Sequence, residues 1–252
     1  MNRPHTLNVL GSALLAICAC HASVAAASVV MTNTRVIFAG DAKEQNLQFT
    51  NLDDAPSVMQ MWVDAGDATS TPDTSDAPFL VNPPIFRIEP KTGQTVRLIF
   101  VGRDLPQDRE SIFYLNSLQI PSLDAAYSNQ NRMLVMLRNR IKVFYRPATI
   151  EGSPETALDK LALRLDRHDG KTRVVLDNPS GYFVSVLGGS ATCGTQVATF
   201  TADMVAPRSG ARWVLNGACP SGPDAAKITI RYVNDYGAID THEYRSTGRS
   251  DQ

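Results

Sequence analysis

The residues best suited to binding chemistry lie in one stretch, where an apolar run is followed by a cluster of cations. Five apolar residues, 133–137, stand directly before Arg138, Arg140, Lys142 and Arg146. A strand with one face in water alternates apolar and polar residues, whereas this run is apolar on both faces. The pattern favours a strand that pairs with something outside its own domain, with positive charge at one end to bind an anion. A central strand buried in its own domain has the same pattern, so both interpretations stay open.

The rest of the sequence gives little support for enzymatic chemistry. Beyond residue 27 the only histidines are His168 and His242, and neither belongs to a GxSxG nucleophile elbow or an HExxH metal motif. No glycine-rich phosphate loop is present either. A secreted hydrolase is therefore a weak alternative, and we expect no catalytic residue, no metal site, no cofactor and no small-molecule substrate.

The first 27 residues are typical of a secretory signal peptide. Arg3 supplies a positive start, residues 7–19 are mostly apolar, and residues 23–27 offer small side chains for cleavage. The apolar run is shorter than the roughly 20 residues that a membrane-spanning helix needs. An uncleaved anchor and lipidation at Cys20 are the alternatives.

The cysteines also indicate export. Cys18 and Cys20 lie in the predicted signal peptide, which leaves Cys193 and Cys219 as a pair. In an oxidising compartment such a pair is expected to form one disulfide. On a chain-entropy argument, closing a loop of about 25 residues stabilises the fold by roughly 3–4 kcal/mol. A structural zinc site is the weaker alternative, because it needs four well-spaced ligands.

Overall charge does not indicate a polyanionic partner. Charged residues make up 19% of the chain and apolar residues 43%, as in ordinary globular proteins. Loss of residues 1–27 removes Arg3 and no acidic residue, so the net charge of −1 becomes −2. We therefore expect no nucleic-acid partner, and the basic cluster is a local feature.

Strands are predicted throughout the first half of the chain. Runs rich in Val, Ile, Leu, Thr and aromatic residues, separated by Gly, Pro, Asn and Asp, lie at 28–38, 45–51, 57–63, 79–88, 94–101, 111–120 and 133–145. Seven such runs in about 120 residues are typical of an immunoglobulin-like sandwich. We predict one such domain over residues 28–150, with residues 64–78 as a surface loop to which we assign no chemistry.

A second all-β domain is predicted over residues 151–252. Residues 151–154 are typical of a linker, and Pro147 ends any continuous strand ladder because it has no N–H to donate. Further strand patterns follow at 161–167, 173–176, 182–187, 196–202, 212–215 and 227–233, with a short one near Tyr244.

Motifs spaced along both domains carry a family resemblance. Two are long, LPQDRES at residues 105–111 and IKVFYRP at 141–147. Shorter ones are TRVIF at 34–38, PP at 83–84, VRL at 96–98, NP at 178–179 and NDYG at 234–237. Together they closely resemble the signature of PapD-like periplasmic pilus (fimbrial) chaperones. One departure is Ser117, where the family usually has an aliphatic residue.

This resemblance implies two immunoglobulin-like β-sandwich domains in an L shape and a function in the periplasm without enzymatic activity. Such chaperones capture pilus subunits whose own sandwich lacks its final strand, and deliver them to an outer-membrane usher. They lend a strand to fill the apolar groove, which is a form of β-augmentation. By position, the side chains of the lent strand are Met133, Val135 and Leu137.

The resemblance also assigns two sets of charges. Arg35 and Lys142 match the cations that bind the subunit's terminal carboxylate and so fix the register of the lent strand; as isolated residues they are ordinary surface cations. Leu137 and Lys142 are an odd number apart, so a flat strand points them to opposite faces unless a bulge or twist intervenes. A second set matches charges near the domain junction, with solvated surface charge as the alternative: Arg97, Glu110, Arg146 and Asp235.

Two further expectations depend on the resemblance. A secreted adhesive or structural immunoglobulin-like module is the alternative function, but we expect such a module to lack both the cationic pair and the DRES block at residues 108–111. The loop at residues 122–132 is short, which in this family goes with chaperones for rod-like pili.

Overall fold

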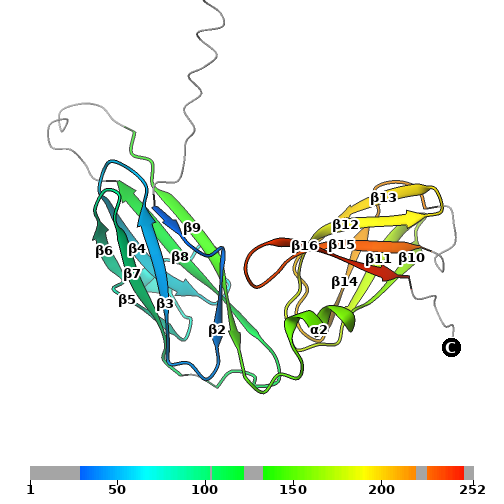
Figure 1. Ribbon diagram of the computed structural model, residues 1–252, viewed down its shortest axis with the longest axis horizontal. Helices are drawn as coiled ribbons and strands as arrows, with labels where there is room; N and C mark the ends of the chain where they lie inside the picture. Colours follow the sequence, from blue (N-terminus) through cyan, green and yellow to red (C-terminus); the bar gives the residue numbers. More distant parts are fainter. Residues whose placement is uncertain (1–28, 103, 122–132, 220–225, 247–252) are drawn as a thin grey trace, which may run out of the picture.

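The computed structural model describes residues 29–102, 104–121, 133–219 and 226–246. Almost every element in it is a strand, and the strands form two separate sandwiches that meet at an angle (Figure 1). The predicted all-β, L-shaped architecture is therefore confirmed. The predicted signal peptide and the short loop 122–132 lie outside the described residues. No helix among the described residues is long and apolar enough to cross a membrane.

The first sandwich consists of a four-stranded sheet, in the order β1-β3-β7-β5, and a five-stranded sheet, in the order β2-β9-β8-β4-β6. The strand bounds are β1 (Val29–Met31), β2 (Arg35–Ala39), β3 (Glu44–Asn51), β4 (Ser57–Asp64), β5 (Phe79–Asn82), β6 (Ile85–Ile88), β7 (Gly93–Phe100), β8 (Ser111–Pro121) and β9 (Leu137–Arg146). A 3₁₀ turn, η1 (Pro72–Thr74), lies in the loop between β4 and β5.

Two of the predicted strands are each divided between the two sheets. The run 28–38 forms β1, which pairs with β3, and then β2, which pairs with β9 in the opposite sheet. The run 79–88 forms β5 in the first sheet and β6 in the second. Pro83 and Pro84 separate these two strands because neither can donate a ladder hydrogen bond.

The core of the first sandwich lies between its two sheets. Phe38, Val96, Leu98 and Val143 have no exposed surface. An aromatic group fills the space around them, in edge-to-face and tilted ring contacts among Phe38, Phe79, Phe100, Phe113 and Tyr145. Burying each such side chain contributes roughly 1.5–3 kcal/mol. This core holds β9 in place through Val143 and Tyr145, at the C-terminal half of the strand.

The second sandwich packs the sheet β10-β11-β14 on the sheet β13-β12-β15-β16. Its strands are β10 (Ala162–His168), β11 (Lys171–Asn178), β12 (Ser185–Cys193), β13 (Gln196–Thr201), β14 (Ser209–Val214), β15 (Lys227–Val233) and β16 (Ile239–Arg245). A disulfide joins Cys193, at the end of β12, to Cys219, with their Cα atoms 5.3 Å apart. The predicted disulfide is confirmed.

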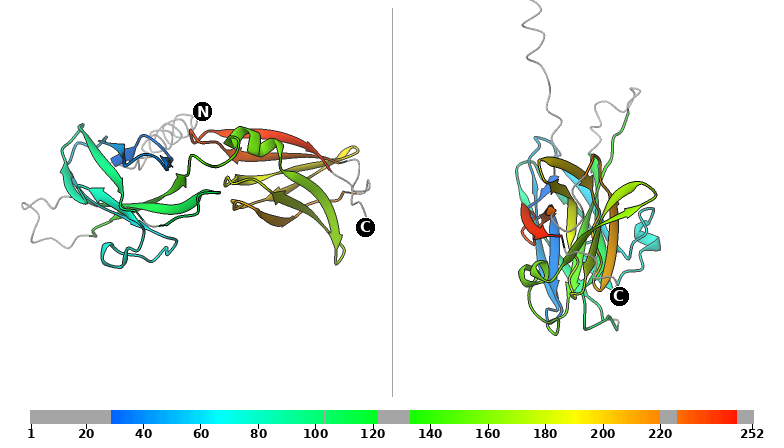
Figure 2. Two further views of the ribbon diagram at one scale, coloured as in Figure 1. Left: turned by 90° about the horizontal axis from the view of Figure 1, so that it is seen from below. Right: turned by 90° about the vertical axis from the view of Figure 1, so that its right-hand side faces the viewer.

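A short helix, α2 (Pro154–Asp159), stands at the entry to the second sandwich, where the sequence predicted only a linker. Ser153 is its N-cap and its side chain accepts a hydrogen bond from the N–H of Thr156. Pro154 follows at the first helical position, where its missing N–H costs nothing. The capping pattern was therefore present in the sequence. The left view of Figure 2 shows α2 beside the junction of the two domains.

Candidate functional site

The apolar run before β9 is exposed. The exposed fractions are 89% for Met133, 59% for Val135 and 43% for Leu137. The regular strand begins only at Leu137, so residues 133–136 precede it rather than forming part of it. The interpretation of this run as a buried central strand is therefore wrong. Apolar side chains gathered this way at a surface indicate an interaction site.

One edge of β9 is open along its first half. On one side β9 pairs with β8 over all but its last residue, from Leu137 opposite Gln119 to Tyr145 opposite Ser111. On the other side β2 begins only at Lys142, so no strand among the described residues covers residues 137–141. These residues therefore present backbone N–H and C=O groups that an incoming strand can pair with.

The faces of β9 follow from its pairing with β8, which runs from Leu137 to Tyr145 without a register shift. The bulge considered from the sequence is absent from this segment. Leu137 and Lys142 therefore point to opposite faces. Lys142, Phe144 and Arg146 share the outer face, whereas Val143 and Tyr145 enter the core.

Lys142 and Arg35 lie side by side where β2 joins β9. The two residues are register partners in the parallel ladder, so their side chains emerge on the same face. No hydrogen bond or ion pair joins the Lys142 ammonium to any described residue. Burial, and after it the repulsion of Arg35, lower the pKa of Lys142. An anion beside the two cations would offset both effects, because it favours the charged form of Lys142.

Arg35 also connects the two domains. Only 9% of its surface is exposed, and its Nη1 donates hydrogen bonds to Val233 O at 3.0 Å and to Ser185 Oγ at 3.3 Å. Its Cζ lies 5.7 Å from the ring centre of Phe144. The Nε atom is buried and has no hydrogen-bond partner among the described residues. Arg35 therefore links the two domains by hydrogen bonds. The Lys142 ammonium makes no such link among the described residues.

Glu110, Arg146 and Asp235 form one ion-pair cluster across the domain junction. Arg146 contacts Glu110 at 2.6 Å and binds both oxygens of Asp235, at 2.7 and 3.0 Å. The second oxygen of Glu110 accepts the N–H of Phe183 at 2.7 Å. Burial raises the pKa of Glu110, against the attraction of Arg146 and the hydrogen bond from Phe183. Bidentate arginine–carboxylate pairs of this kind fix orientation as well as distance.

The loop that carries Asp235 is built to reach the first sandwich (Figure 1). The Asn234 side chain accepts hydrogen bonds from the N–H groups of Tyr236 and Ala238, both at 3.0 Å. Gly237 has a φ of 85°, and a Cβ placed there would lie 2.1 Å from Thr34 Oγ1. Glycine is therefore required by both the backbone conformation and the close approach of the two domains.

The assignment of Arg97 to the junction is wrong. Arg97 lies on β7, in the sheet opposite to β9, and its Nη1 contacts Glu44 Oε2 at 3.3 Å. Both side chains are about half exposed. The reason is the sandwich itself, because Arg97 lies in the four-stranded sheet, whereas Lys142 and Arg146 lie on β9 of the five-stranded sheet.

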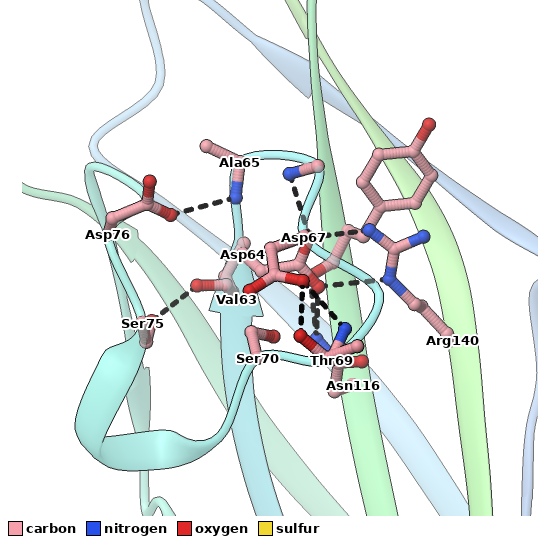
Figure 3. Close-up of polar contacts among 12 residues, drawn as sticks. Val63, Asp64, Ala65, Asp67, Thr69, Ser70, Ser75, Asp76, Asn116 and Arg140 are labelled. Atoms are coloured by element: carbon pink, nitrogen blue, oxygen red, sulfur yellow. Dashed lines mark hydrogen bonds and ion pairs between the residues drawn. The ribbon is translucent and has the colours of Figure 1, made fainter.

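Two cations of the basic cluster have partners that the sequence did not reveal. Arg140 pairs with Asp64, at the end of β4 (Figure 3). Arg138 donates a hydrogen bond to Asn116 on β8. Asp64 begins the segment that we predicted to be a chemically silent loop. In the sequence, Asp64 stands out only as an acidic residue at the end of an apolar strand. Such a residue more often marks a turn than a buried ion pair.

The described features define an immunoglobulin-like two-domain protein with an open, apolar strand edge beside the adjacent cations Lys142 and Arg35. Residues 28–151 match the family described as pili and flagellar-assembly chaperone, PapD N-terminal domain. Residues 156–244 match the family described as pili assembly chaperone PapD, C-terminal domain. The chain belongs to this family of pilus-assembly chaperones.

Individual relatives agree with this membership. The probable fimbrial chaperone YadV of Escherichia coli is 33% identical over 223 residues, covering 87% of this chain and 90% of the relative. The chaperone protein FimB/FhaD of Bordetella pertussis is 33% identical over 244 residues, 93% of each chain. The crystal structure of YadV matches 87% of this chain and all of its own, with a TM-score of 0.73 at 30% identity.

Proposed function

We propose that this protein is a periplasmic chaperone that captures pilus subunits by lending them the segment before and at the start of β9. The observation that carries the proposal is the combination of exposed apolar side chains with an uncovered strand edge at residues 137–141. An incoming strand gains backbone hydrogen bonds from the edge and apolar burial from the side chains. The protein acts by binding, without a catalytic step, and passes its subunit to an outer-membrane usher.

Burial of the lent side chains provides much of the binding energy. Met133, Val135 and Leu137 are alternate residues, so in an extended strand they enter the same groove. Burying three such side chains contributes roughly 5–9 kcal/mol before the cost of association is subtracted. Met133 and Val135 are more than half exposed in the free protein, so most of this energy is still available.

Lys142 and Arg35 supply the register. The subunit's terminal carboxylate binds between them and accepts charge-assisted hydrogen bonds, each of which contributes about 1.5–3 kcal/mol. A fixed chain end matters because a slip of one residue turns every side chain of the incoming strand to the opposite face. The ion-pair cluster of Glu110, Arg146 and Asp235 keeps the two sandwiches at the angle that leaves this site open.

The proposal is tested by Val135→Glu, with co-expression of a cognate subunit and pull-down of the complex. A charge at this position cannot enter an apolar groove, so we expect capture to fall sharply while circular dichroism stays native. Val197→Glu is the matched control, because Val197 is 63% exposed on the second sandwich. Equal capture by Val135→Glu and the control would contradict strand lending.

A further inference from the structure

A buried polar network on the outer face of the first sandwich is not used by the proposed capture. It spans three strands, with Asp64 on β4, Asn116 on β8, and Arg138 and Arg140 on β9. Figure 3 shows Asp64, Asn116 and Arg140 together. Asp64 and Asn116 have no exposed surface, although they face away from the apolar core. Polar groups lose their hydrogen bonds to water when they are buried, so they need a complete set of partners within the protein.

The Asp64 carboxylate has such a set. One oxygen accepts from Arg140 Nη2 at 2.5 Å and from the N–H of Gly66 at 2.8 Å. The other accepts from Arg140 Nε at 3.0 Å and from Asn116 Nδ2 at 2.7 Å. The amide oxygen of Asn116 in turn accepts two hydrogen bonds from Arg138, at 3.1 and 2.8 Å. Both arginines of β9 are thus connected across β8 to one carboxylate on β4.

The same two arginines also stack on aromatic rings. The Arg140 guanidinium lies 3.6 Å from the centre of the Tyr114 ring, and that of Arg138 lies 4.8 Å from the Trp62 ring. Trp62 is itself fixed, since its Nε1 donates to Ser70 Oγ at 3.1 Å in the loop that follows β4. The loop therefore completes the network rather than lying free on the surface.

The position of the network along β9 is informative. Residues 138 and 140 belong to the half of the strand that β2 does not cover. The other face of this half has little packing, because Leu137 and Asn139 are exposed. An edge with no second strand, and with core contact only through the partly buried Ile141, opens easily. The network therefore stabilises the part of β9 that has no neighbouring strand on one side and little packing against the core.

We propose that Asp64 is a positioning residue that holds the first half of β9 extended and in register before a subunit arrives. It acts through Arg140 and Asn116 and does not touch the subunit. Pre-organisation of this kind increases binding by reducing the ordering that binding would otherwise require. The inference rests on the proposed function, since it concerns the strand that is lent.

Hydrogen exchange in full-length Asp64→Asn tests the proposal. We expect those backbone amides of residues 137–141 that bond to β8 to exchange about tenfold faster or more, because local opening is no longer opposed by the charged pair. Amides of residues 142–146, which β2 covers, should keep their protection. Asp166→Asn is the matched control, since Asp166 pairs with Arg173 at 3.6 Å in the second sandwich.

Capture kinetics with a cognate subunit provide the second readout. The association rate constant should fall about threefold to tenfold in Asp64→Asn, because fewer molecules present an ordered strand. The dissociation rate constant should stay unchanged, since the bound subunit itself pairs with residues 137–141. A merely structural defect would lower the active fraction and leave both rate constants alone.

A second variant covers the case in which Asp64→Asn unfolds the sandwich. Asp64→Asn combined with Arg140→Met removes the connection without leaving a buried unpaired charge, and should show the same local exchange and slower association. Wild-type exchange and association in both variants would overturn the proposal. Lys142→Met tests the proposed function separately. This variant should lose capture, whereas the amides of residues 137–141 that bond to β8 should keep their protection from exchange.

Discussion

Replacement of Lys142 by methionine should separate stability from function. Lys142 and Arg35 are adjacent cations on neighbouring strands, about 4.8 Å apart at the backbone. With charges roughly 6–10 Å apart at an effective dielectric of about 20, their repulsion is about 1.5–3 kcal/mol. Solvent screening reduces this to about 1 kcal/mol. Lys142→Met keeps the packing of the stem and removes the repulsion together with the weaker attraction of Asp203, so we expect the free protein to be stabilised by at most this amount.

The expected shift is measurable. For a domain of this size, 1 kcal/mol corresponds to a rise in Tm of about 3–6 °C. Capture should meanwhile weaken by roughly 10- to 150-fold, the equivalent of one charge-assisted hydrogen bond of about 1.5–3 kcal/mol. The assays are thermal unfolding by circular dichroism and titration with a cognate subunit. Lys171→Met, an exposed lysine on β11, is the control and should change neither quantity.

Two results would refute this reasoning in different ways. Wild-type affinity in Lys142→Met would show that the lysine does not bind the subunit's carboxylate. A lower Tm together with lost capture would show that Lys142 stabilises the fold. The repulsion between Lys142 and Arg35 would then not destabilise the free protein. Arg35→Ala is less informative, because it also removes the hydrogen bonds to Ser185 and Val233.

The remaining predictions concern the disulfide and acid stability. Reduction, or Cys193→Ser, should lower the stability of the second sandwich by about 3–4 kcal/mol, because the bond closes a loop of 26 residues; unchanged unfolding under reducing conditions would count against this. Burial opposes the charged form of Asp64, but hydrogen bonds from Arg140, Asn116 and Gly66 outweigh it and lower the pKa of Asp64. The stabilisation that the Asp64 carboxylate gives the folded protein is therefore complete above the unfolded-state pKa of about 3.9. It is lost as pH falls through the lower pKa of Asp64 in the folded protein. Acid unfolding of Asp64→Asn should accordingly be less steep than that of the wild type, and equal slopes would contradict the assignment.

The sequence was sufficient for the fold class and for the location of most strands. Alternation and turn residues placed β3, β4, β7 and β8 to within about one residue, because each is bounded by polar or glycine-containing turns. It could not show that β1 and β2 belong to different sheets. Such a strand switch depends on which edge is free in the assembled sandwich, and this is a property of tertiary structure.

The site was predictable only where its residues act locally or match a family motif. The apolar run before β9 stands out by its composition, although only the structure shows that it is exposed, and Lys142 was found from the family motif around it. The misplacement of Arg97 and the oversight of Asp64 have one cause, since each pairs with a residue far along the chain. Asp64 and Arg140 are 76 residues apart, and only the order of β4, β8 and β9 in the sheet brings them together.

The central claim is that residues 133–141 become a strand of another protein's sandwich. The most direct measurement is hydrogen exchange at these residues in the free chaperone and in its complex with a cognate subunit. We expect strong protection of alternate backbone amides in this segment on binding, with little change at residues 142–146, which β2 already covers. Unchanged exchange at residues 133–141 in a stable complex would contradict strand lending and would place the binding surface elsewhere.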